Sequence, residues 1–269
     1  MAGVLGLVRR LVSFARRLAP ALRSAVCLAG SPGPAARVST APRPWRTGLT
    51  SLAIGTGAAV FGVLGWLVGS GSAASVDLAI STGVQSADSS LLAVGMQAIS
   101  SFGSSSLGLL GLAGAPLVLW RLGHPLASRF VAIGTLGALG ASALLKDLWQ
   151  RQRPTDDLIQ VIAGSPEGHS FPSGHTLLYV SFFGFLFYWT FTFVPAGRTR
   201  TLLLWTFGGL VGLIGLARVY LGHHWASDVL ASYALGFAWL LILVQWYARA
   251  RLSRARPSVQ TLTATLQRR

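Results

Sequence analysis

Long apolar stretches separated by short polar segments dominate the pattern of the chain. A helix of about 20 residues crosses a hydrocarbon core of about 30 Å. Six stretches of roughly that length carry no charge or nearly none, and each predicts a membrane-spanning helix. They lie at about residues 47–68, 103–120, 126–147, 173–194, 201–222 and 226–247. The pattern therefore predicts an all-α, polytopic integral membrane protein, a bundle of six transmembrane helices.

The segment between the first two of these stretches has a different pattern. Residues 77–101 include Asp77 and Asp88 and mix polar with apolar positions. Such a mixture is less apolar than a membrane span requires. We interpret the segment as a long loop with an interfacial helix rather than as a seventh span.

Composition excludes a soluble globular domain. Of the 269 residues, 52% are apolar and only 11% are charged, and the mean hydropathy is +0.58, whereas an ordinary soluble domain is about 25% charged. The high hydrophobicity also excludes a disordered chain. Cys27 is the only cysteine, which excludes a disulfide scaffold. An integral membrane protein is the class that remains.

The net charge of +15 is distributed as in a membrane protein rather than a nucleic-acid-binding protein. Eight arginines precede the first apolar stretch and six follow the last one. With the N-terminus in the cytoplasm, 18 of the 22 basic residues fall on the inner side and all seven acids on the outer side. The positive-inside rule therefore predicts cytoplasmic termini. We expect membrane lipids as partners and no nucleic acid, and we take the plasma (inner) membrane of a bacterium as the location.

The two basic ends are predicted to lie outside the bundle. Residues 1–46 contain no acid, and apolar residues from Leu5 to Ala15 recur at helical spacing. We interpret this extension as amphipathic or disordered, lying on the anionic inner leaflet, with an organellar transit peptide as the alternative. The expected organisation is a basic extension at 1–46, a six-span domain at 47–247 and a basic cytoplasmic tail at 248–269.

Four cations are predicted to lie on the outer side, where the positive-inside rule does not explain them. They are Lys146, Arg151, Arg153 and Arg218. Lys146 and Arg153 are seven residues apart, close to two helical turns, so both can point the same way and hold a dianion together. Two snorkelling cations at a membrane boundary are the alternative for this pair. We interpret Arg151, between them, as a solvated or headgroup-facing cation. Arg218 offers a planar donor fork suited to phosphate oxygens, or it is a cation favoured by a helix C-terminus.

The start of the fourth apolar stretch is a candidate anion site. Pro172 suits the first turn of a helix. The free amides that follow, beside the hydroxyl of Ser173 and the open backbone of Gly174, would bind an anion at the helix N-terminus. His175 would stand beside that anion, and a plain interfacial histidine is the alternative.

The third polar cluster pairs a histidine with a carboxylate. His224 and Asp228 are four residues apart, so on a helix the carboxylate lies on the face of the imidazole and can fix its tautomer. A metal site formed by these two with His223 is disfavoured, because adjacent residues point to different sides of a helix and no further ligand-rich motif completes the site. We therefore expect neither a metal nor another cofactor.

The three motifs resemble those of the type 2 phosphatidic acid phosphatase superfamily, the lipid phosphate phosphatases. That family shares its active-site pattern with vanadium haloperoxidases and bacterial nonspecific acid phosphatases. The pattern is Lys, six residues, Arg-Pro; then Pro-Ser-Gly-His; then Ser-Arg, five residues, His, three residues, Asp. The matching positions are Lys146, Arg153, Pro154, Pro172, Ser173, Gly174, His175, Arg218, His224 and Asp228. Ala217 stands where the pattern often has serine, which affects fine positioning but removes neither the nucleophile nor a cation.

The resemblance implies a role for each matching residue. His224 is expected to attack phosphorus and form a phosphohistidine, with Asp228 holding its ring, while His175 acts as general acid and then as general base. The remaining positions are expected to bind the phosphate, and they are Lys146, Arg153, Ser173, Gly174 and Arg218. No metal is required by this scheme.

The resemblance also implies an activity, namely hydrolysis of a lipid phosphomonoester or diphosphate at the outer face of the membrane. Candidate substrates are undecaprenyl diphosphate, phosphatidate and phosphatidylglycerol phosphate. One alternative is a non-catalytic protein that binds or transports anionic lipids. A vanadate-dependent halide oxidiser is a second alternative, and the membrane-spanning layout argues against it.

Overall fold

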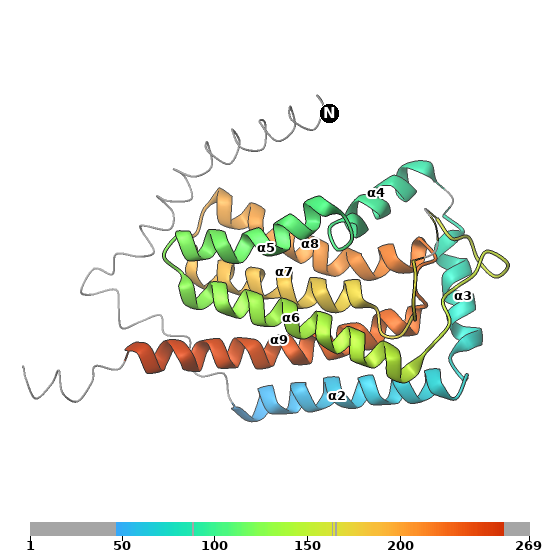
Figure 1. Ribbon diagram of the computed structural model, residues 1–269, viewed down its shortest axis with the longest axis horizontal. Coiled ribbons are helices and arrows are strands. Elements are labelled where there is room, and N and C mark those ends of the chain that lie inside the picture. Colours follow the sequence, from blue (N-terminus) through green and yellow to red (C-terminus); the bar gives the residue numbers. More distant parts are fainter. Residues whose placement is uncertain (1–46, 88, 163, 165, 256–269) are drawn as a thin grey trace, which may run out of the picture.

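The computed structural model describes residues 47–87, 89–162, 164 and 166–255, and every regular element among them is a helix. Figure 1 shows the arrangement. The helices are α2 (Thr47–Gly69), α3 (Ala74–Gln85), α4 (Ser90–Ser101), α5 (Ser106–Arg121), α6 (Pro125–Trp149), α7 (Gly174–Phe193), α8 (Arg198–Tyr220) and α9 (Ala226–Ala255). The predicted extension at 1–46 and the end of the predicted tail, 256–269, lie outside the described residues. The last helix continues past residue 247, where the sequence pattern placed its end.

Five helices are long and apolar enough to cross a membrane: α2, α6, α7, α8 and α9. The second predicted span is shorter than expected, because α5 has only 16 residues. A helix of that length extends about 24 Å, less than the hydrocarbon core. The α4–α5 pair qualifies as one broken span with a bend of 42°. The chain is therefore an all-helical integral membrane protein with five spans, or six if this bent pair is counted as one.

Residues 77–101 are mostly helical, whereas the sequence pattern predicted a long loop with one interfacial helix. They contain most of α3 and all of α4, whose first turn is capped by the Ser89 hydroxyl, which accepts from Leu92 N at 3.4 Å. Figure 1 shows α3 lying across one end of the bundle. The prediction failed because Asp77 is buried in α3, so its charge does not mark a solvent-exposed loop.

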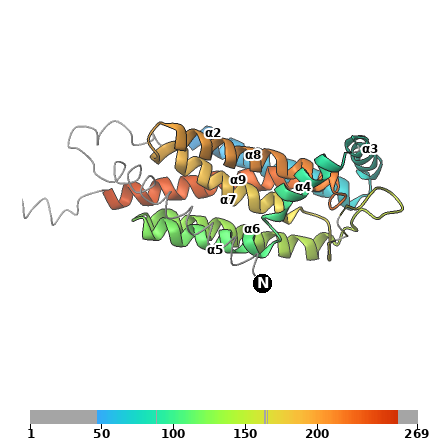
Figure 2. The same ribbon diagram turned by 90° about the horizontal axis from the view of Figure 1, so that it is seen from above.

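The centre of the bundle is α7, which packs against α6, α8 and α9. Figure 2 shows α7 and α9 between α5 and α6 on one side and α2 and α8 on the other. Large aromatic side chains fill this centre, including Tyr179, Phe182, Phe185 and Trp189. Because lipid tails are as apolar as these side chains, close packing rather than escape from water stabilises such contacts. The buried start of α7 is thereby held in place.

Aromatic contacts also attach α2 to the segment that leads into α7. Trp149 Nε1 donates to Gly65 O at 2.9 Å, and a Cβ at Gly65 would lie 2.7 Å from the Trp149 ring. Phe171 is fully buried, and its ring contacts Trp149 and Phe61 with centroids 5.2 and 5.6 Å away. The residues just before α7 are therefore fixed from both sides.

Candidate active site

The three sequence motifs meet at one end of the bundle. Lys146 lies in the last turn of α6 and Arg218 in the last turn of α8, while His175 and Asp228 lie in the first turns of α7 and α9. Figure 1 shows these four helix ends together, at the end that α3 crosses. Residues more than 80 positions apart in the sequence therefore share one site.

His224 lies in the α8–α9 connection with its side chain almost completely buried. Its Nδ1 is 3.5 Å from Asp228 Oδ2, longer than a good hydrogen bond but within ion-pair range. Ser170 fits between them, since its hydroxyl lies 3.4 Å from His224 Nδ1 and donates to Asp228 Oδ2. The same oxygen accepts from Trp225 N at 2.9 Å. This arrangement turns Nδ1 toward the carboxylate and leaves Nε2 for other chemistry.

Arg153 faces the opposite nitrogen of His224. Its Nη1 lies 3.2 Å from His224 Nε2 and donates to His223 O at 2.6 Å. Its Nε donates to Gly168 O at 2.8 Å and its Nη2 to Glu167 O at 3.3 Å. Backbone carbonyls thus hold the guanidinium beside Nε2, which is the nitrogen that would face a phosphate bound by Arg153.

Two further cations surround His224. Arg218 is buried, its Nη1 donates to Ser100 Oγ at 2.7 Å, and its Nε has no hydrogen-bond partner among the described residues. Burial, together with the charges of Arg218, Arg153 and Lys146, lowers the pKa of His224 well below its usual value. The imidazole is therefore neutral near pH 7 and keeps a lone pair on one nitrogen. A buried guanidinium N–H without an acceptor favours an anionic ligand at this place.

The start of α7 lies beside these cations. Ser173 is fully buried at the N-cap position, and its hydroxyl accepts from Thr176 Oγ1 at 3.1 Å. Gly174 contacts α6 so closely that a Cβ would lie 2.8 Å from Ser142 Oγ. The amides of the first helical turn have no partner within the helix. The structure thus places Ser173 and Gly174 where the sequence predicted an anion site.

His175 is packed against the turn between α4 and α5. A Cβ at Gly103 would lie 2.5 Å from His175 Cδ2 and 2.8 Å from Nε2. His175 Nε2 is buried, and no residue in the described part of the chain accepts from it or donates to it. His175 also lies near enough to Arg218 to interact with its charge. A titratable ring with a free nitrogen therefore borders the cation cluster.

Arg151 is not the solvated cation that the sequence suggested, and that interpretation was wrong. Its side chain is only 13% exposed. It pairs with Asp77 at 2.6 Å and with Asp228 at 2.5 Å, and it donates to Ser227 Oγ at 2.7 Å. Ser227 also bonds Asp77, through its amide at 2.8 Å and its hydroxyl at 2.6 Å. Arg151 thus joins α3 to the carboxylate that faces His224.

Helices α3 and α4 supply further contacts that sequence reasoning missed. Gln85 Nε2 donates to Gln160 O at 2.7 Å and to Tyr220 O at 2.9 Å, and Ser100 contacts Arg218. For Asp77 a signal existed, because an ionisable residue in an otherwise apolar segment marks a functional contact by default. Ser170 lies two residues before the motif that begins at Pro172, whereas nothing in the sequence distinguishes Ser100.

His223 forms part of the wall rather than of the cation cluster. Its Nε2 lies 2.9 Å from Ile162 O, and burial followed by the charge of Arg218 lowers its pKa to about 4. Among the described residues, no three side chains of the His, Cys, Asp or Glu types gather as metal ligands. The arrangement has what a phosphate site needs, namely several fixed cations and a neutral buried imidazole.

Comparisons with known proteins agree with this chemistry. Residues 126–252 match the model of the PAP2 superfamily. Phosphatidylglycerophosphatase B of Bacillus subtilis is 29% identical over 155 residues, which are 56% of this chain and 73% of the relative. Decaprenylphosphoryl-5-phosphoribose phosphatase of Mycobacterium tuberculosis is 33% identical over 168 residues, 60% of this chain and 84% of the relative.

A solved structure shows the same fold. It is a crystal structure of a transmembrane PAP2-type phosphatidylglycerolphosphate phosphatase from Bacillus subtilis, with a TM-score of 0.62. The similarity covers 75% of this chain and 99% of that one at 22% sequence identity. The helical arrangement, and not only the motifs, is therefore shared.

Proposed function

Because this chain belongs to the PAP2 superfamily of membrane phosphatases, we propose that it hydrolyses a lipid phosphate through a phosphohistidine formed on His224. Membership confirms two predictions from the motifs, the superfamily itself and a phosphoric ester hydrolase. It argues against the alternative of a lipid-binding or transport protein without turnover. The residue roles, the substrate and the membrane face belong to the proposal.

In the first step, His224 Nε2 attacks phosphorus in line with the oxygen that leaves. The P–N bond forms as the P–O bond to the lipid breaks, and His175 gives its proton to the leaving oxygen. The Nδ1 proton of His224 stays toward Asp228, which stabilises the positive ring. In this step His224 is the nucleophile and His175 is the general acid.

In the second step, water attacks the phosphohistidine. His175 takes a proton from that water as the P–N bond breaks, which releases inorganic phosphate and returns His175 to its starting state. Lys146, Arg153 and Arg218, with the hydroxyl of Ser173 and the amide of Gly174, bind the non-bridging oxygens in both steps. Most of the catalytic effect is expected from these fixed charges, as is usual for phosphoryl transfer.

The observation that carries the proposal is the environment of His224 Nε2. This nitrogen lies 3.2 Å from Arg153 Nη1, while the other ring nitrogen faces Asp228 and Ser170. A phosphate held by Arg153 and Arg218 would thus lie beside the Nε2 lone pair of a neutral imidazole. No metal is needed, since the protein's own cations balance the phosphate charge.

We propose the outer, non-cytoplasmic face as the place of reaction, and the plasma membrane of a bacterium as the location. The site lies at the bundle end that the positive-inside rule puts outside, where a lipid headgroup can reach it while the chains stay in the bilayer. The relatives are a phosphatidylglycerophosphatase and a decaprenylphosphoryl-5-phosphoribose phosphatase. A lipid phosphomonoester is therefore the preferred substrate class, ahead of a diphosphate such as undecaprenyl diphosphate.

Phosphate release by the detergent-purified protein tests the proposal. The panel is phosphatidylglycerol phosphate, phosphatidate, undecaprenyl diphosphate and a phosphorylated decaprenylphosphoryl ribose, each with excess chelator. We expect release from at least one lipid and a loss of more than about 10³-fold in His224→Ala. The ranking of the panel identifies the substrate class.

His223→Ala is the matched control, because the neighbouring histidine lies in the same loop and its Nε2 contacts Ile162 O, whereas His224 Nε2 contacts Arg153. We expect it to keep activity within about tenfold of the parent. Trapping the intermediate with ³²P-labelled substrate should label the parent and not His224→Ala. Undiminished turnover in His224→Ala would reject the nucleophile assignment.

A further inference from the structure

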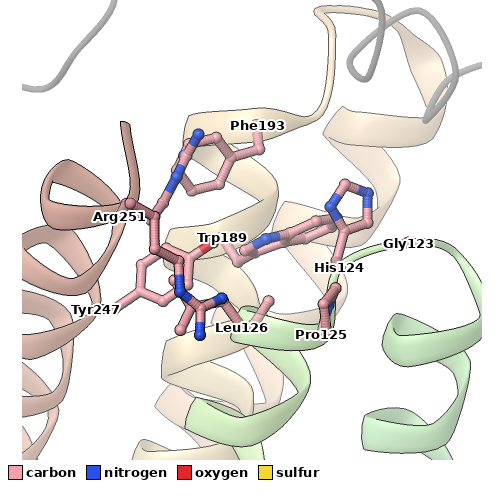
Figure 3. Close-up of a pocket in the computed structure, with 10 residues that line it drawn as sticks. Gly123, His124, Pro125, Leu126, Trp189, Phe193, Tyr247 and Arg251 are labelled. Carbon is pink, nitrogen blue, oxygen red and sulfur yellow. The ribbon is translucent and has the colours of Figure 1, made fainter. Parts of the chain in front are cut away.

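A cavity of about 290 Å³ lies at the end of the bundle opposite the candidate active site. It is bounded by the α5–α6 turn, the last turns of α7 and the last turns of α9. Figure 3 shows His124, Trp189, Tyr247 and Arg251 around it. The volume is roughly ten times the share of one water molecule in the liquid, enough for a lipid headgroup. Nothing in the proposed phosphatase reaction uses this place.

The lining of the cavity is strongly positive. Arg251 and Arg254 both line it, and none of the ion pairs among the described residues includes either of them. The Arg251 guanidinium lies 4.0 Å from the centroid of the Phe193 ring, which positions the cation. The first turn of α6, which begins at Pro125, contributes the positive end of a helix dipole, and the last turns of α7 and α9 contribute negative ends, so the positive charge of the lining comes from the two arginines. An anionic group would relieve this uncompensated charge.

His124 contributes to the same wall. His124 Nε2 is buried and has no hydrogen-bond partner in the described part of the chain. Its ring is held edge-on against Trp189, with centroids 5.0 Å apart. A buried polar atom without a partner is costly unless a ligand or solvent satisfies it. Because Nε2 is closed off from the cavity surface, the arginines and not this atom are the polar contacts of an occupant.

The terminal segments of the chain itself are poor occupants. Residues 1–46 and 256–269 contain no Asp or Glu and carry many arginines. Their side chains would add positive charge to a cavity that already has two arginines. The occupant must instead bring negative charge, and the membrane is the nearest source of it.

The shape of the lining selects a lipid over a free anion. Trp189, Phe193 and Tyr247 form an aromatic wall beside the arginines. Such rings are typical of the depth at which headgroups meet acyl chains. A free phosphate would satisfy the cations only, whereas a phosphodiester lipid satisfies the cations and covers the rings as well.

We propose that this cavity binds the phosphodiester headgroup of an anionic phospholipid in the leaflet opposite the candidate active site. The phosphate lies between Arg251, Arg254 and the first turn of α6, and the glycerol portion contacts the aromatic wall. The bound lipid links α6, α7 and α9 at the end where the catalytic residues do not hold these helices together. It is a structural ligand and is not hydrolysed there.

Lipid-dependent thermal stabilisation tests this site. The delipidated protein in a neutral detergent is titrated with short-chain phosphatidylglycerol, and the midpoint of unfolding is recorded at each concentration. We expect a saturable rise in the parent. In Arg251→Gln/Arg254→Gln the concentration for half the effect should increase at least fivefold. Phosphatidylcholine at equal concentration should give a much smaller rise.

Three comparisons distinguish binding in this cavity from a general charge effect and from binding at the candidate active site. Arg249→Gln removes the same charge from an exposed position of α9 outside the cavity, and it should titrate like the parent. Arg153→Ala removes a cation of the candidate active site, and it should keep the stabilisation. The proposal would be overturned if Arg249→Gln lost as much of the lipid-dependent stabilisation as the double variant, or if Arg153→Ala lost it. Full stabilisation of the parent by inorganic phosphate alone would also overturn it.

A variant with a single substitution keeps the test valid if the double variant misfolds. Arg254→Gln changes only one exposed side chain, and it should weaken the response while its unfolding midpoint without lipid stays that of the parent. Native mass spectrometry gives a second readout, since the parent and Arg249→Gln should retain one phosphatidylglycerol more than Arg251→Gln/Arg254→Gln. Equal retention by all three proteins would contradict the site.

Discussion

Asp228 is the residue at which two sets of contacts meet. One carboxylate oxygen faces His224 and accepts from Ser170 and Trp225, and the other accepts from Arg151. Arg151 in turn is bound to Asp77. The orientation of the proposed nucleophile therefore depends on a buried ion-pair chain that begins in a different helix, α3.

Removing Arg151 should affect both stability and rate. Arg151→Gln leaves two buried carboxylates without their cation, and breaking a buried ion pair costs about 3–5 kcal/mol. We expect a lower unfolding midpoint and a kcat about 10–100-fold below the parent, with KM changed much less. Steady-state kinetics and thermal unfolding of the purified variant measure the two effects.

The double variant Asp77→Asn/Arg151→Gln distinguishes coupling from general damage. Because it removes an acid together with its cation, it should be more stable than Arg151→Gln alone. Single-variant losses that simply add in the double variant would show that the two side chains do not act together.

His223 makes stability depend on pH. Its pKa in the folded protein is about 4, below the ordinary value of 6.5, so between these values the unfolded chain binds more protons than the folded one. Stability is therefore full above pH 6.5 and is lost as the pH falls toward 4. His223→Asn should show a smaller fall of the unfolding midpoint between pH 7 and pH 5 than the parent. If the unfolding midpoints of the parent and the variant fell equally with pH, His223 would not be the cause of the pH dependence.

For single residues, the sequence predicted those that belong to the motifs and missed those that hydrogen-bond or pair with them. Lys146, Arg153, Arg218 and His224 are recognisable because their spacing is fixed by the chemistry and by the helix ends that carry them. Arg151 was misjudged because its partner Asp77 is 74 positions away. Spacing within a motif carries no information about such a partner.

Besides the helices that carry the three motifs, the bent α4–α5 pair contacts the site directly. Its turn places Gly103 against His175, and its first helix supplies Ser100 to Arg218 and the backbone of Ile99 to Tyr179. The turn therefore borders the proposed general acid. A broken apolar stretch resembles one shorter span in the sequence, which is why the pattern placed this helix at 103–120 and left α4 unrecognised.

Gly103→Ala should disturb the ring of His175. The added methyl would lie 2.5 Å from His175 Cδ2, so the ring must move. We expect kcat to fall about tenfold or more with a small change in the unfolding midpoint. Kinetics on the best lipid of the panel measure this.

Gly95→Ala is the matched control in the same bent pair, because a Cβ there meets no atom within 4 Å. It should retain the activity of the parent. Equal losses in the two variants would mean that the pair tolerates no alanine, and the contact with His175 would not be the cause.

For the whole molecule, the two ends of the bundle differ in the charged residues that they carry. One end combines acids and cations in the candidate active site, and the other carries arginines around the headgroup cavity. The apolar periodicity predicted the helical bundle between them. Neither the aromatic centre around α7 nor the cavity could be predicted, because both depend on which helices are neighbours.

Cysteine accessibility tests the predicted orientation. On a Cys27→Ser background, Asp157→Cys lies in the exposed α6–α7 connection and Ser253→Cys is exposed near the end of α9. With the N-terminus inside, a membrane-impermeant maleimide should label Asp157→Cys in intact cells and Ser253→Cys only after lysis. The reverse pattern would place the candidate active site in the cytoplasm.

The ion-pair chain from α3 to α9 has a consequence for biosynthesis. Asp77 is made 74 residues before Arg151 and 150 residues before Ser227, its two partners. During translation, Asp77 can therefore meet Arg151 only after α6 is made, and Ser227 only when α9 is inserted. The same insertion delivers Asp228 to His224. A chain halted before α9 would lack Ser227 and Asp228, so the candidate active site would be incomplete.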